Sequence, residues 1–191
     1  MKVGLTGGIG CGKSTVVAFF RDAGWRTIES DALVRELLSA DPEVQRHLRS
    51  RWGDAVFNGG EVDRKAVAAR VFGNDAELEW LESLLHPLVR ERWQRCVAQN
   101  PDGLWLVEIP LLFEKRLETL FDLTVCVSSP PAIVEDRMVA RGYSGAEIAQ
   151  RRERQMPLEH KIERADHLIC NAGSLEFLKR QTTRLIEQIT T

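Results

Sequence analysis

The residues best suited to chemistry stand near the start of this 191-residue chain. Residues 7–14 read Gly-Gly-Ile-Gly-Cys-Gly-Lys-Ser and match the pattern G-x-x-x-x-G-K-[ST] at every fixed position. Glycines allow a sharp turn whose backbone N–H groups converge on phosphate oxygens. Lys13 adds a positive charge for the outer phosphates, and the Ser14 hydroxyl is suited to ligate Mg²⁺. The segment therefore predicts a P-loop that binds a nucleoside triphosphate and Mg²⁺.

A P-loop does not indicate which molecule receives the phosphate. Acidic residues elsewhere in the chain bear on that question. The chain has no Asn-Lys-x-Asp run, so a GTPase is not expected. Asp31 follows an expected strand, and the carboxyl ends of parallel strands meet at one edge of a sheet. We expect it to accept the proton of an acceptor hydroxyl or to hold Mg²⁺ through water. A plain helix N-cap is the alternative, and both roles are compatible. Glu108, which ends another expected strand, is a second residue that could hold Mg²⁺ through water.

Two arginines form the next chemical feature. Arg137 and Arg141 are four residues apart, so on a helix they share one face. Two guanidinium groups there could bridge the oxygens of a phosphate in transfer. The alternative is a solvated basic face, which is what most charge runs are. Gly142 and Gly145 can act as hinges, which favours a mobile lid in this region.

The elements that position these residues alternate between strands and helices. Short apolar runs predict strands at 2–6, 26–30, 104–109, 123–127 and 167–170. Helical spacing predicts helices at 13–23, 31–38, 131–141 and 174–189. This alternation predicts an α/β fold with a parallel sheet of about five strands, flanked by helices, of the kind that carries a P-loop.

Between the second and third expected strands the chain is helical and too long for a simple crossover. Asp41 and Asp63 are expected N-caps, and residues 58–60 read as a turn. A long helical pattern covers 75–98, and Pro87 should bend or split it. We interpret this block as an inserted helical subdomain.

Composition narrows the class of protein. The net charge of −2 argues against a protein that binds nucleic-acid phosphates, and no apolar run approaches the ~20 residues that span a membrane. The four cysteines form no C-x-x-C pair, and the chain shows no secretory signal. We therefore expect a cytoplasmic protein with reduced thiols.

Several segments together resemble the dephospho-coenzyme A kinase family. Residues 5–15 resemble its opening, and Ile28-Glu29-Ser30-Asp31 stands where the family usually reads Ile-Asp-Ala-Asp. Residues 85–89 match its His-Pro segment, and residues 109–114 match its Pro-Leu-Leu-Phe-Glu run. The remaining matches fall in the family's order: Arg137, Arg141, Gln155, Lys161, Ala165, Asp166 and Asn171.

The resemblance implies a phosphotransferase with an alcohol acceptor. ATP, with Mg²⁺, phosphorylates the 3′-hydroxyl of dephospho-coenzyme A, giving coenzyme A and ADP in the last step of coenzyme A synthesis. It also implies three parts: a core at 1–38, 103–135 and 166–191, a substrate-binding insertion at about 40–100, and a lid at about 137–160. Dephospho-coenzyme A is the expected partner, without nucleic acid, membrane or an obligate protein partner.

The resemblance also implies roles for matching residues. The expected catalytic residues are Lys13, Asp31, Arg137 and Arg141. The expected nucleotide contacts are Gly8, Gly10, Cys11, Gly12, Lys13, Ser14, Thr15 and Asn171. The expected acceptor contacts are Thr6, Asp31, His86, Leu111 and Arg141. Mg²⁺ is expected on Ser14, with Asp31 or Glu108 contributing through water.

The chain departs from the family pattern at two residues and in one spacing. Glu29 replaces a common aspartate. The spacing from Arg141 to Gln155 is shorter than in the family, so either Arg151 or Arg152 corresponds to the lid arginine. Cys11 replaces a common serine, and a thiol at a helix N-terminus is expected to have a lowered pKa. That predicts inhibition by thiol oxidants with protection by ATP. The alternative is that a small residue is simply tolerated there.

Two other functions remain open at this point. One is a different small-molecule P-loop kinase, of the nucleoside or nucleotide type. The other is a non-catalytic, ATP-dependent switch that grips a protein partner through the helical block.

Overall fold

The computed structural model describes residues 1–190, which fall into two compact units. Met1–Glu29 together with the chain from Asn100 onward forms one of them, which we call the sheet unit. Ser30–Gln99 forms the other, the helical unit. Across residues 1–190, none of the helices combines the length and apolarity that a bilayer crossing requires.

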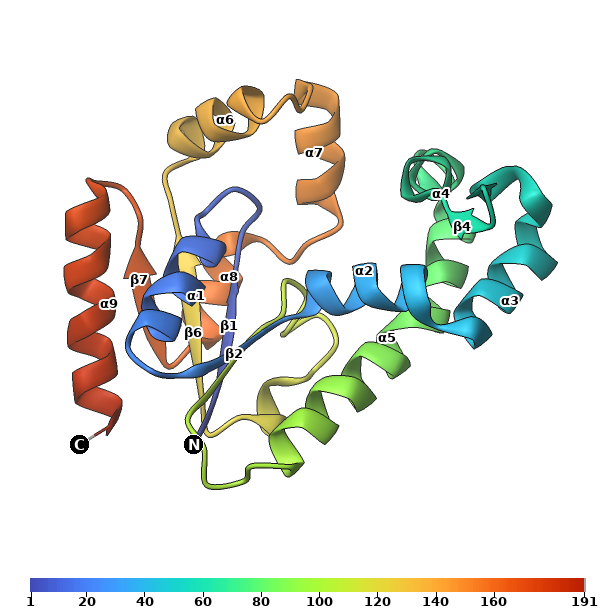
Figure 1. Ribbon diagram of the computed structural model, residues 1–191. Helices are drawn as coiled ribbons and strands as arrows, with labels where there is room; N and C mark the ends of the chain where they lie inside the picture. The colour runs from blue at the N-terminus through green and yellow to red at the C-terminus, as the bar shows by residue number, and fades with distance from the viewer. Residues whose placement is uncertain (191) are drawn as a thin grey trace. The chain divides into compact units, whose positions relative to one another are not determined.

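The sheet unit is built on a five-stranded sheet in the order β2-β5-β1-β6-β7 (Figure 1). Its strands are β1 (Lys2–Gly7), β2 (Arg26–Glu29), β5 (Trp105–Glu108), β6 (Leu123–Ser128) and β7 (His167–Cys170). Each neighbouring pair of strands is parallel. The expected α/β class and the parallel sheet of about five strands are therefore confirmed.

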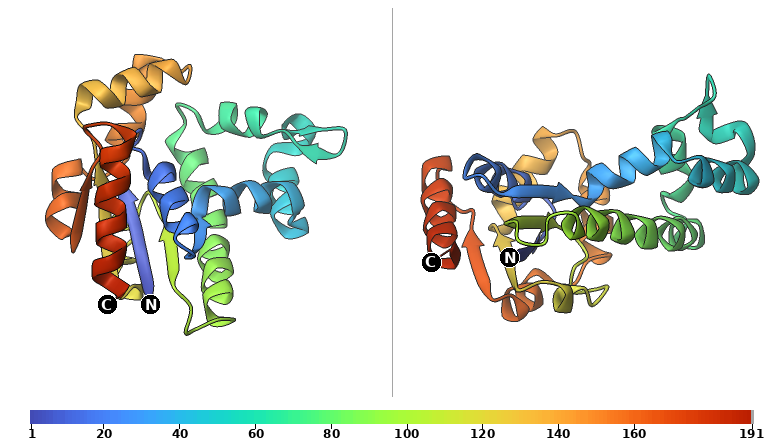
Figure 2. Two further views of the ribbon diagram at one scale, coloured as in Figure 1. Left: turned by 60° about the vertical axis from the view of Figure 1, so that its left-hand side comes forward. Right: turned by 60° about the horizontal axis from the view of Figure 1, so that its bottom comes forward.

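The central strand β1 shows how the sheet is covered on both faces. Val3 and Leu5 belong to the main apolar core, together with residues of α1 (Lys13–Asp22) and α9 (Leu175–Thr190). Alternate residues of a strand point to opposite faces, so Gly4 faces the other side. A Cβ there would lie 2.7 Å from Leu112 Cδ1, which leaves no room for a larger residue. The chain after β5 therefore packs directly on this second face, where α8 (Leu158–Arg164) also contacts β1 and β6 (Figure 2).

Two more helices of this unit stand near the carboxyl end of the sheet. In Figure 1, α6 (Pro131–Ala140) and α7 (Gly145–Glu153) lie beyond β1 and β6, on the side of the P-loop. Ser144 caps α7, because its hydroxyl accepts from the Glu147 N–H while the Glu147 carboxylate accepts from the Ser144 N–H. The helix expected to reach about Arg141 ends at Ala140, and neither α7 nor α8 was expected.

The helical unit contains α2 (Ser30–Ala40), α3 (Pro42–Trp52), η1 (Gly53–Val56), α4 (Arg64–Val71) and α5 (Asp75–Ala98). Two of its helices begin at the expected caps. The Asp41 carboxylate accepts from two N–H groups at the start of α3, and the Asp63 carboxylate does so at the start of α4. Asp31 is different, because α2 begins at Ser30 and Asp31 lies inside its first turn. The N-cap role expected for Asp31 is therefore wrong. The positive N-terminal end of the helix still stabilises a carboxylate in its first turn.

A short hairpin surrounds the turn expected at 58–60, in a block that was otherwise expected to be helical. β3 (Phe57–Asn58) and β4 (Glu61–Val62) pair antiparallel across Gly59 and Gly60, whose φ angles are 59° and 90°. The turn at 58–60 is confirmed. The strands escaped prediction because two residues are too few to show the alternation of a strand.

Pro87 does not split the long helix, as α5 runs unbroken from Asp75 to Ala98. Proline lacks an N–H, so the carbonyl of Ser83 loses its helical partner. Pro87 and Ser83 are both exposed, so water can satisfy that carbonyl at little cost. The expected split was therefore wrong, whereas the alternative expectation of a bend stays a prediction.

Aromatic and charged contacts hold the helical unit together. The Trp52 and Trp80 rings meet edge to face at 5 Å, within the range such pairs prefer. Glu77 accepts from the Trp52 indole N–H and from two nitrogens of Arg51. These hydrogen bonds hold the pKa of Glu77 below its usual range.

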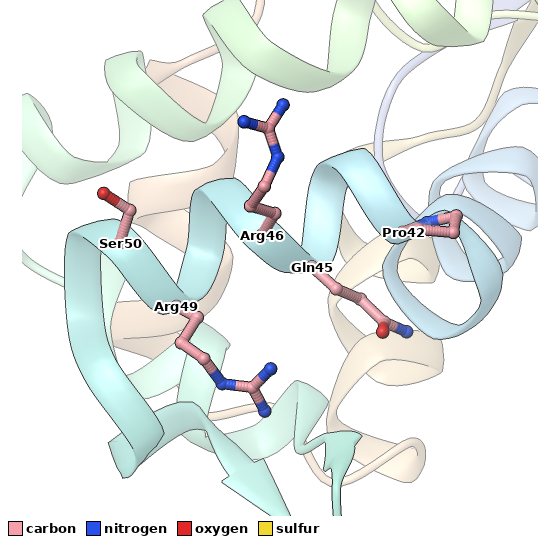
Figure 3. A pocket seen from close by; sticks show the side chains of 5 residues that line it. All are labelled: Pro42, Gln45, Arg46, Arg49 and Ser50. Atoms are coloured by element: carbon pink, nitrogen blue, oxygen red, sulfur yellow. The ribbon is translucent and has the colours of Figure 1, made fainter.

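An open hollow of about 340 Å³ lies on one side of α3 (Figure 3). The residues that line it all come from that helix: Pro42, Gln45, Arg46, Arg49 and Ser50. Arg46 is paired with Glu43, and Arg49 with Asp54. None of the residues expected to act in function lines this hollow.

Candidate active site

The predicted P-loop connects β1 to α1. Gly10 and Gly12 have φ angles of 70° and 96°, in the left-handed region that favours glycine. A Cβ on Gly12 would also lie 2.2 Å from the Asn171 amide nitrogen, and one on Gly7 would lie 2.2 Å from the Val127 carbonyl oxygen. These glycines are therefore required both by backbone conformation and by close packing. Together with the N-terminal end of α1, the loop has the features of a phosphate site.

Lys13 lies over the loop that precedes it. Its ammonium donates to the carbonyl oxygens of Gly7 and Gly8, at 3.3 and 3.0 Å. It also lies 3.9 Å from the Glu108 carboxylate, and the two side chains are only 12% and 8% exposed. The sheet register explains this pairing, because Glu108 at the end of β5 stands beside Leu5 of β1. A largely desolvated positive charge is thus held at the carboxyl edge of the sheet.

Asn171, which is distant from the P-loop in sequence, holds the loop by a hydrogen bond. Its buried amide donates to the Cys11 carbonyl oxygen at 2.9 Å. Arg137 donates in turn to the Asn171 amide oxygen and to the Ser129 hydroxyl, each at 3.2 Å. The Ser129 hydroxyl donates to the Asn171 carbonyl oxygen at 2.7 Å. The loop peptide, β7 and α6 are thereby joined in one hydrogen-bonded network.

Ser129 was missed by the sequence analysis. It directly follows β6, where polar residues gather at the carboxyl edge of a parallel sheet, so a signal for it was present. The two expected phosphate arginines differ in environment. Arg137 is half-buried and bonded to Asn171, whereas Arg141 is exposed at the C-terminal cap of α6.

The expectation for Cys11 is contradicted. Its thiol is 1% exposed and belongs to the main apolar core. Burial raises the pKa of Cys11, and this effect outweighs the opposite pull of the nearby Lys13 charge. A buried thiol with a raised pKa is poorly reactive, so the structure favours a small residue tolerated in place of serine over a redox-sensitive site.

The remaining residues expected to bind the nucleotide lie along the loop and at the start of α1. Gly8 and Gly10 are partly exposed, Ser14 is exposed in the first turn of α1, and Thr15 is partly buried. The Ser14 hydroxyl and the Glu108 carboxylate offer hard oxygen donors, which suit Mg²⁺. Within residues 1–190 no group of three or more His, Cys, Asp or Glu side chains could hold a metal by itself. Mg²⁺ bound mainly by phosphates needs only one or two protein ligands, so the residues present fit it.

Besides Arg141, two residues expected to contact the acceptor lie in the sheet unit. Leu111 is partly exposed on the turn that follows β5. Thr6 is fully buried, and its hydroxyl donates to the Pro110 carbonyl oxygen at 3.2 Å. Thr6 therefore supports the turn that carries Leu111.

Asp31 and His86 lie in the helical unit. Asp31 is exposed in the first turn of α2. His86 lies in α5, and its Nδ1 is 3.9 Å from the Glu82 carboxylate. The structure thus brings the phosphate-side residues together within the sheet unit, while Asp31 and His86 belong to the other unit.

Two arginines of α7 can also be told apart. Both are exposed, but Arg151 lies over the Tyr143 ring, 5.0 Å from its centre. The contact fixes Arg151 against the start of the α7 segment.

Sequence comparison relates the chain to known proteins. The dephospho-CoA kinase family model matches residues 1–176. Dephospho-CoA kinase of Thermosynechococcus vestitus is 37% identical over 184 residues, covering 95% of this chain and 91% of that protein. The enzyme of Chlorobaculum tepidum is 36% identical over 200 residues, covering 100% of this chain and 96% of that protein.

Solved structures give the same result. A Thermus thermophilus protein superposes with a TM-score of 0.83 at 36% identity, covering 100% of this chain and 98% of that one. Dephospho-CoA kinase from Campylobacter jejuni superposes with a TM-score of 0.73 at 25% identity, covering 99% and 98%. A shikimate kinase from Bacteroides thetaiotaomicron, at 16% identity and a TM-score of 0.53, shares the fold alone. With a P-loop in place and matches along nearly its whole length, the chain belongs to the dephospho-CoA kinase family.

Proposed function

We propose that this protein transfers the terminal phosphate of ATP to the 3′-hydroxyl of dephospho-coenzyme A, which gives coenzyme A and ADP. Family membership supports the choice of substrate. The observation that carries the phosphate side is the P-loop with Lys13 held between loop carbonyls and Glu108. Phosphoryl transfer needs positioned charge more than a strong base, and this arrangement provides it.

The chain's own residues position the nucleotide in this proposal. The P-loop N–H groups from Gly8 to Thr15 bind phosphate oxygens, and Lys13 turns from the loop carbonyls toward the outer phosphates. Asn171 and Arg137 keep the loop in shape through the Cys11 carbonyl. Mg²⁺, for which Ser14 is the proposed ligand with Asp31 or Glu108 acting through water, would neutralise charge on the phosphates.

The acceptor side is proposed residue by residue. Asp31 is the proposed group that orients the acceptor hydroxyl and receives its proton. Leu111 provides an apolar wall, and His86 contacts the acceptor. Arg141 is exposed and able to reach a phosphate when the lid closes. We assign the substrate-binding insertion to about residues 40–100 and the lid to about residues 137–160.

The setting of the reaction is also part of the proposal. We place the protein in the cytoplasm, acting on a small molecule without nucleic acid, membrane or an obligate protein partner. The net charge of −2 supports this, because proteins that bind nucleic-acid phosphates usually carry a basic excess.

A mass-spectrometric assay with ATP, Mg²⁺ and dephospho-coenzyme A tests the proposal. Wild-type protein should give a product heavier by one phosphate. Lys13→Ala should lose on the order of 10³-fold in kcat/KM, because a charge aimed at the transferred phosphate is removed. Asp31→Ala should lose on the order of 10²-fold or more. Matched controls are Lys179→Ala and Asp102→Ala, since both residues are exposed and lie outside the P-loop, the insertion and the lid.

The outcomes separate the parts of the proposal. Full activity of Asp31→Ala would remove the proposed acid and leave the reaction. A 3′-deoxy analogue of dephospho-coenzyme A that is still phosphorylated would contradict the 3′-hydroxyl as acceptor. Wild-type protein that binds ATP but makes no product would overturn the proposed function. A screen of nucleosides, nucleotides and shikimate as acceptors would then show whether the protein is another kinase. No turnover with any of them would favour the non-catalytic switch.

A further inference from the structure

Lys161 is the buried cation of the sheet unit. Within residues 1–190 it is the one lysine or arginine that is buried, with 0% exposure. It lies in α8, well apart in sequence from the P-loop, and the phosphate chemistry described above does not use it. Burying a charged lysine away from water costs free energy unless polar partners compensate for the lost hydration. The partners of Lys161 therefore indicate its role.

The Lys161 ammonium binds a single turn of the chain. It donates to the Pro110 carbonyl oxygen at 2.7 Å and pairs with the Glu114 carboxylate at 2.8 Å. The same Pro110 oxygen accepts from the Thr6 hydroxyl of β1. One buried charge of α8 therefore holds both ends of the turn 110–114, which carries Leu111, and Thr6 joins the same turn to β1.

Glu114 extends this connection to the segment after α7. Its Oε1 accepts from the Met156 N–H at 2.8 Å, and Met156 lies three residues beyond Glu153, where α7 ends. The Lys161 ammonium thus joins α8 to the turn 110–114. Thr6 connects the same turn to β1, and Glu114 connects it to the chain that leaves α7.

The pair is poorly arranged if stability alone is its purpose. Glu114 Oε2 is buried and forms no hydrogen bond within residues 1–190. Buried ion pairs often stabilise a fold no better than apolar residues of similar volume. A role in holding a specific geometry explains better why charged groups occupy this place.

We propose that Lys161 is a positioning residue: together with Glu114 it fixes the turn 110–114 and the chain after α7 in the arrangement that binds the acceptor. The acceptor part rests on the proposed function. Lys161 does not touch ATP or the reacting atoms. It acts through Pro110 and Glu114 on Leu111, and it gives the proposed lid a fixed attachment at its carboxyl end.

Steady-state kinetics on Lys161→Met and on the double variant Lys161→Met/Glu114→Gln test this role. The single variant leaves the Glu114 charge unpaired and should lower the melting temperature clearly. The double variant removes that charge but keeps an oxygen for the Met156 N–H, so its melting temperature should return toward wild type. Its KM for dephospho-coenzyme A should stay about tenfold raised, with the KM for ATP unchanged, because the Pro110 carbonyl still lacks the Lys161 donor.

Lys179→Met serves as the matched control, because Lys179 is exposed on α9 and the same charge is lost. A double variant that recovers both melting temperature and acceptor KM would reduce Lys161 to a structural role. An equal rise in both KM values would also contradict the proposal.

Hydrogen–deuterium exchange provides a measure that does not depend on the substrate. The amides of Lys115 and Leu117 close the turn by bonding to the Leu111 and Leu112 carbonyl oxygens. They should exchange faster in the double variant than in wild type, while those of β1 stay protected. If the protein does not phosphorylate dephospho-coenzyme A, the proposed function fails but this exchange still decides the positioning role. Unchanged exchange in the turn would overturn it.

Discussion

The sheet unit and the helical unit place their polar side chains in opposite ways. In the sheet unit, charged and polar groups such as Glu108, Lys161 and Asn171 are buried, and each is paired with another polar side chain. In the helical unit, ion pairs such as Arg95 with Glu91 lie at the surface, with more than half of each side chain exposed.

This difference indicates which unit depends on individual polar side chains for its geometry. Buried polar groups interact strongly because water does not screen them, so they can hold a loop or a turn in one geometry. Surface pairs are screened and contribute little. We therefore expect the sheet unit to be sensitive to single substitutions and the helical unit to tolerate them.

Thiol labelling should show the largest contrast between the units. Cys96 is exposed on α5 of the helical unit, whereas Cys11 and Cys126 are buried in the sheet unit. Burial raises the pKa of Cys11 and raises that of Cys126 to about 11. At about pH 8 these two thiols stay protonated and covered, so native alkylation should be on the order of 10³-fold slower than at Cys96.

Peptide mass spectrometry after timed N-ethylmaleimide treatment measures these rates, and denatured protein serves as the reference. Equal native rates at Cys11 and Cys96 would break the comparison. They would also restore the idea that oxidants act through Cys11.

Glycine substitutions should give the next largest difference. Gly12 and Gly73 have φ angles of 96° and 71°, so alanine strains the backbone at either position. Only at Gly12 does the added Cβ also meet another residue, at 2.2 Å from Asn171, while nothing lies within 4 Å at Gly73. Gly12→Ala should weaken ATP binding on the order of 10²-fold, and Gly73→Ala should leave ATP binding unchanged.

Calorimetric titration with ATP measures both affinities, and thermal melts report the shared backbone strain. An ATP affinity of Gly12→Ala equal to that of Gly73→Ala would show that Asn171 moves aside at no cost.

Asp166 should give a smaller, pH-dependent effect. Its carboxylate accepts from the Thr124 hydroxyl and N–H, and these hydrogen bonds hold its pKa below the ordinary value of 3.8. A lowered folded-state pKa stabilises the protein above that value, and the stabilisation is lost as the pH falls through the folded pKa. Asp166→Asn should therefore cost about 1 kcal/mol near neutral pH, a modest value because the residue is largely exposed.

Urea unfolding of wild type and variant across the acid range tests this. The difference should shrink as the pH drops below 3.8. Asp63→Asn is the control from the helical unit, because asparagine caps a helix as well as aspartate does. A pH-independent loss for Asp166→Asn would contradict the charge argument.

The smallest effect is expected for the surface pair of α5. Glu91 stands four residues before Arg95, the favourable order for a helical ion pair. Arg95→Gln should cost about 0.3–0.5 kcal/mol at low salt and less at high salt. Urea midpoints at the two salt concentrations measure it. A loss above that of Asp166→Asn would reverse the ranking of the two units.

Local signals in the sequence were enough for the elements and for the P-loop. The strand at 167–170, the caps at Asp41 and Asp63, and the glycine turn at 58–60 all follow from nearby residue types. The hairpin was missed because its strands have two residues each. Pro87 was misinterpreted because its cost depends on whether water reaches the freed carbonyl.

Burial of individual polar side chains could not be read from the chain. Lys161 is a lysine in a charged segment, which usually indicates a solvated surface. Its burial depends on Pro110 and Glu114, about fifty residues earlier. Cys11 was misjudged for the same reason: its neighbours in sequence indicate a helix N-terminus, but packing in the core decides its pKa.

The sequence by itself determined the P-loop, the parallel α/β class and the family, because glycine spacing, apolar periodicity and short motifs are local properties. Only the tertiary structure decided that Asn171 and Ser129 hold the loop, that Cys11 is buried with a raised pKa, and that Lys161 holds the turn 110–114. The physical reason is desolvation. The strength of a charge or hydrogen bond depends on which distant residues exclude water from it.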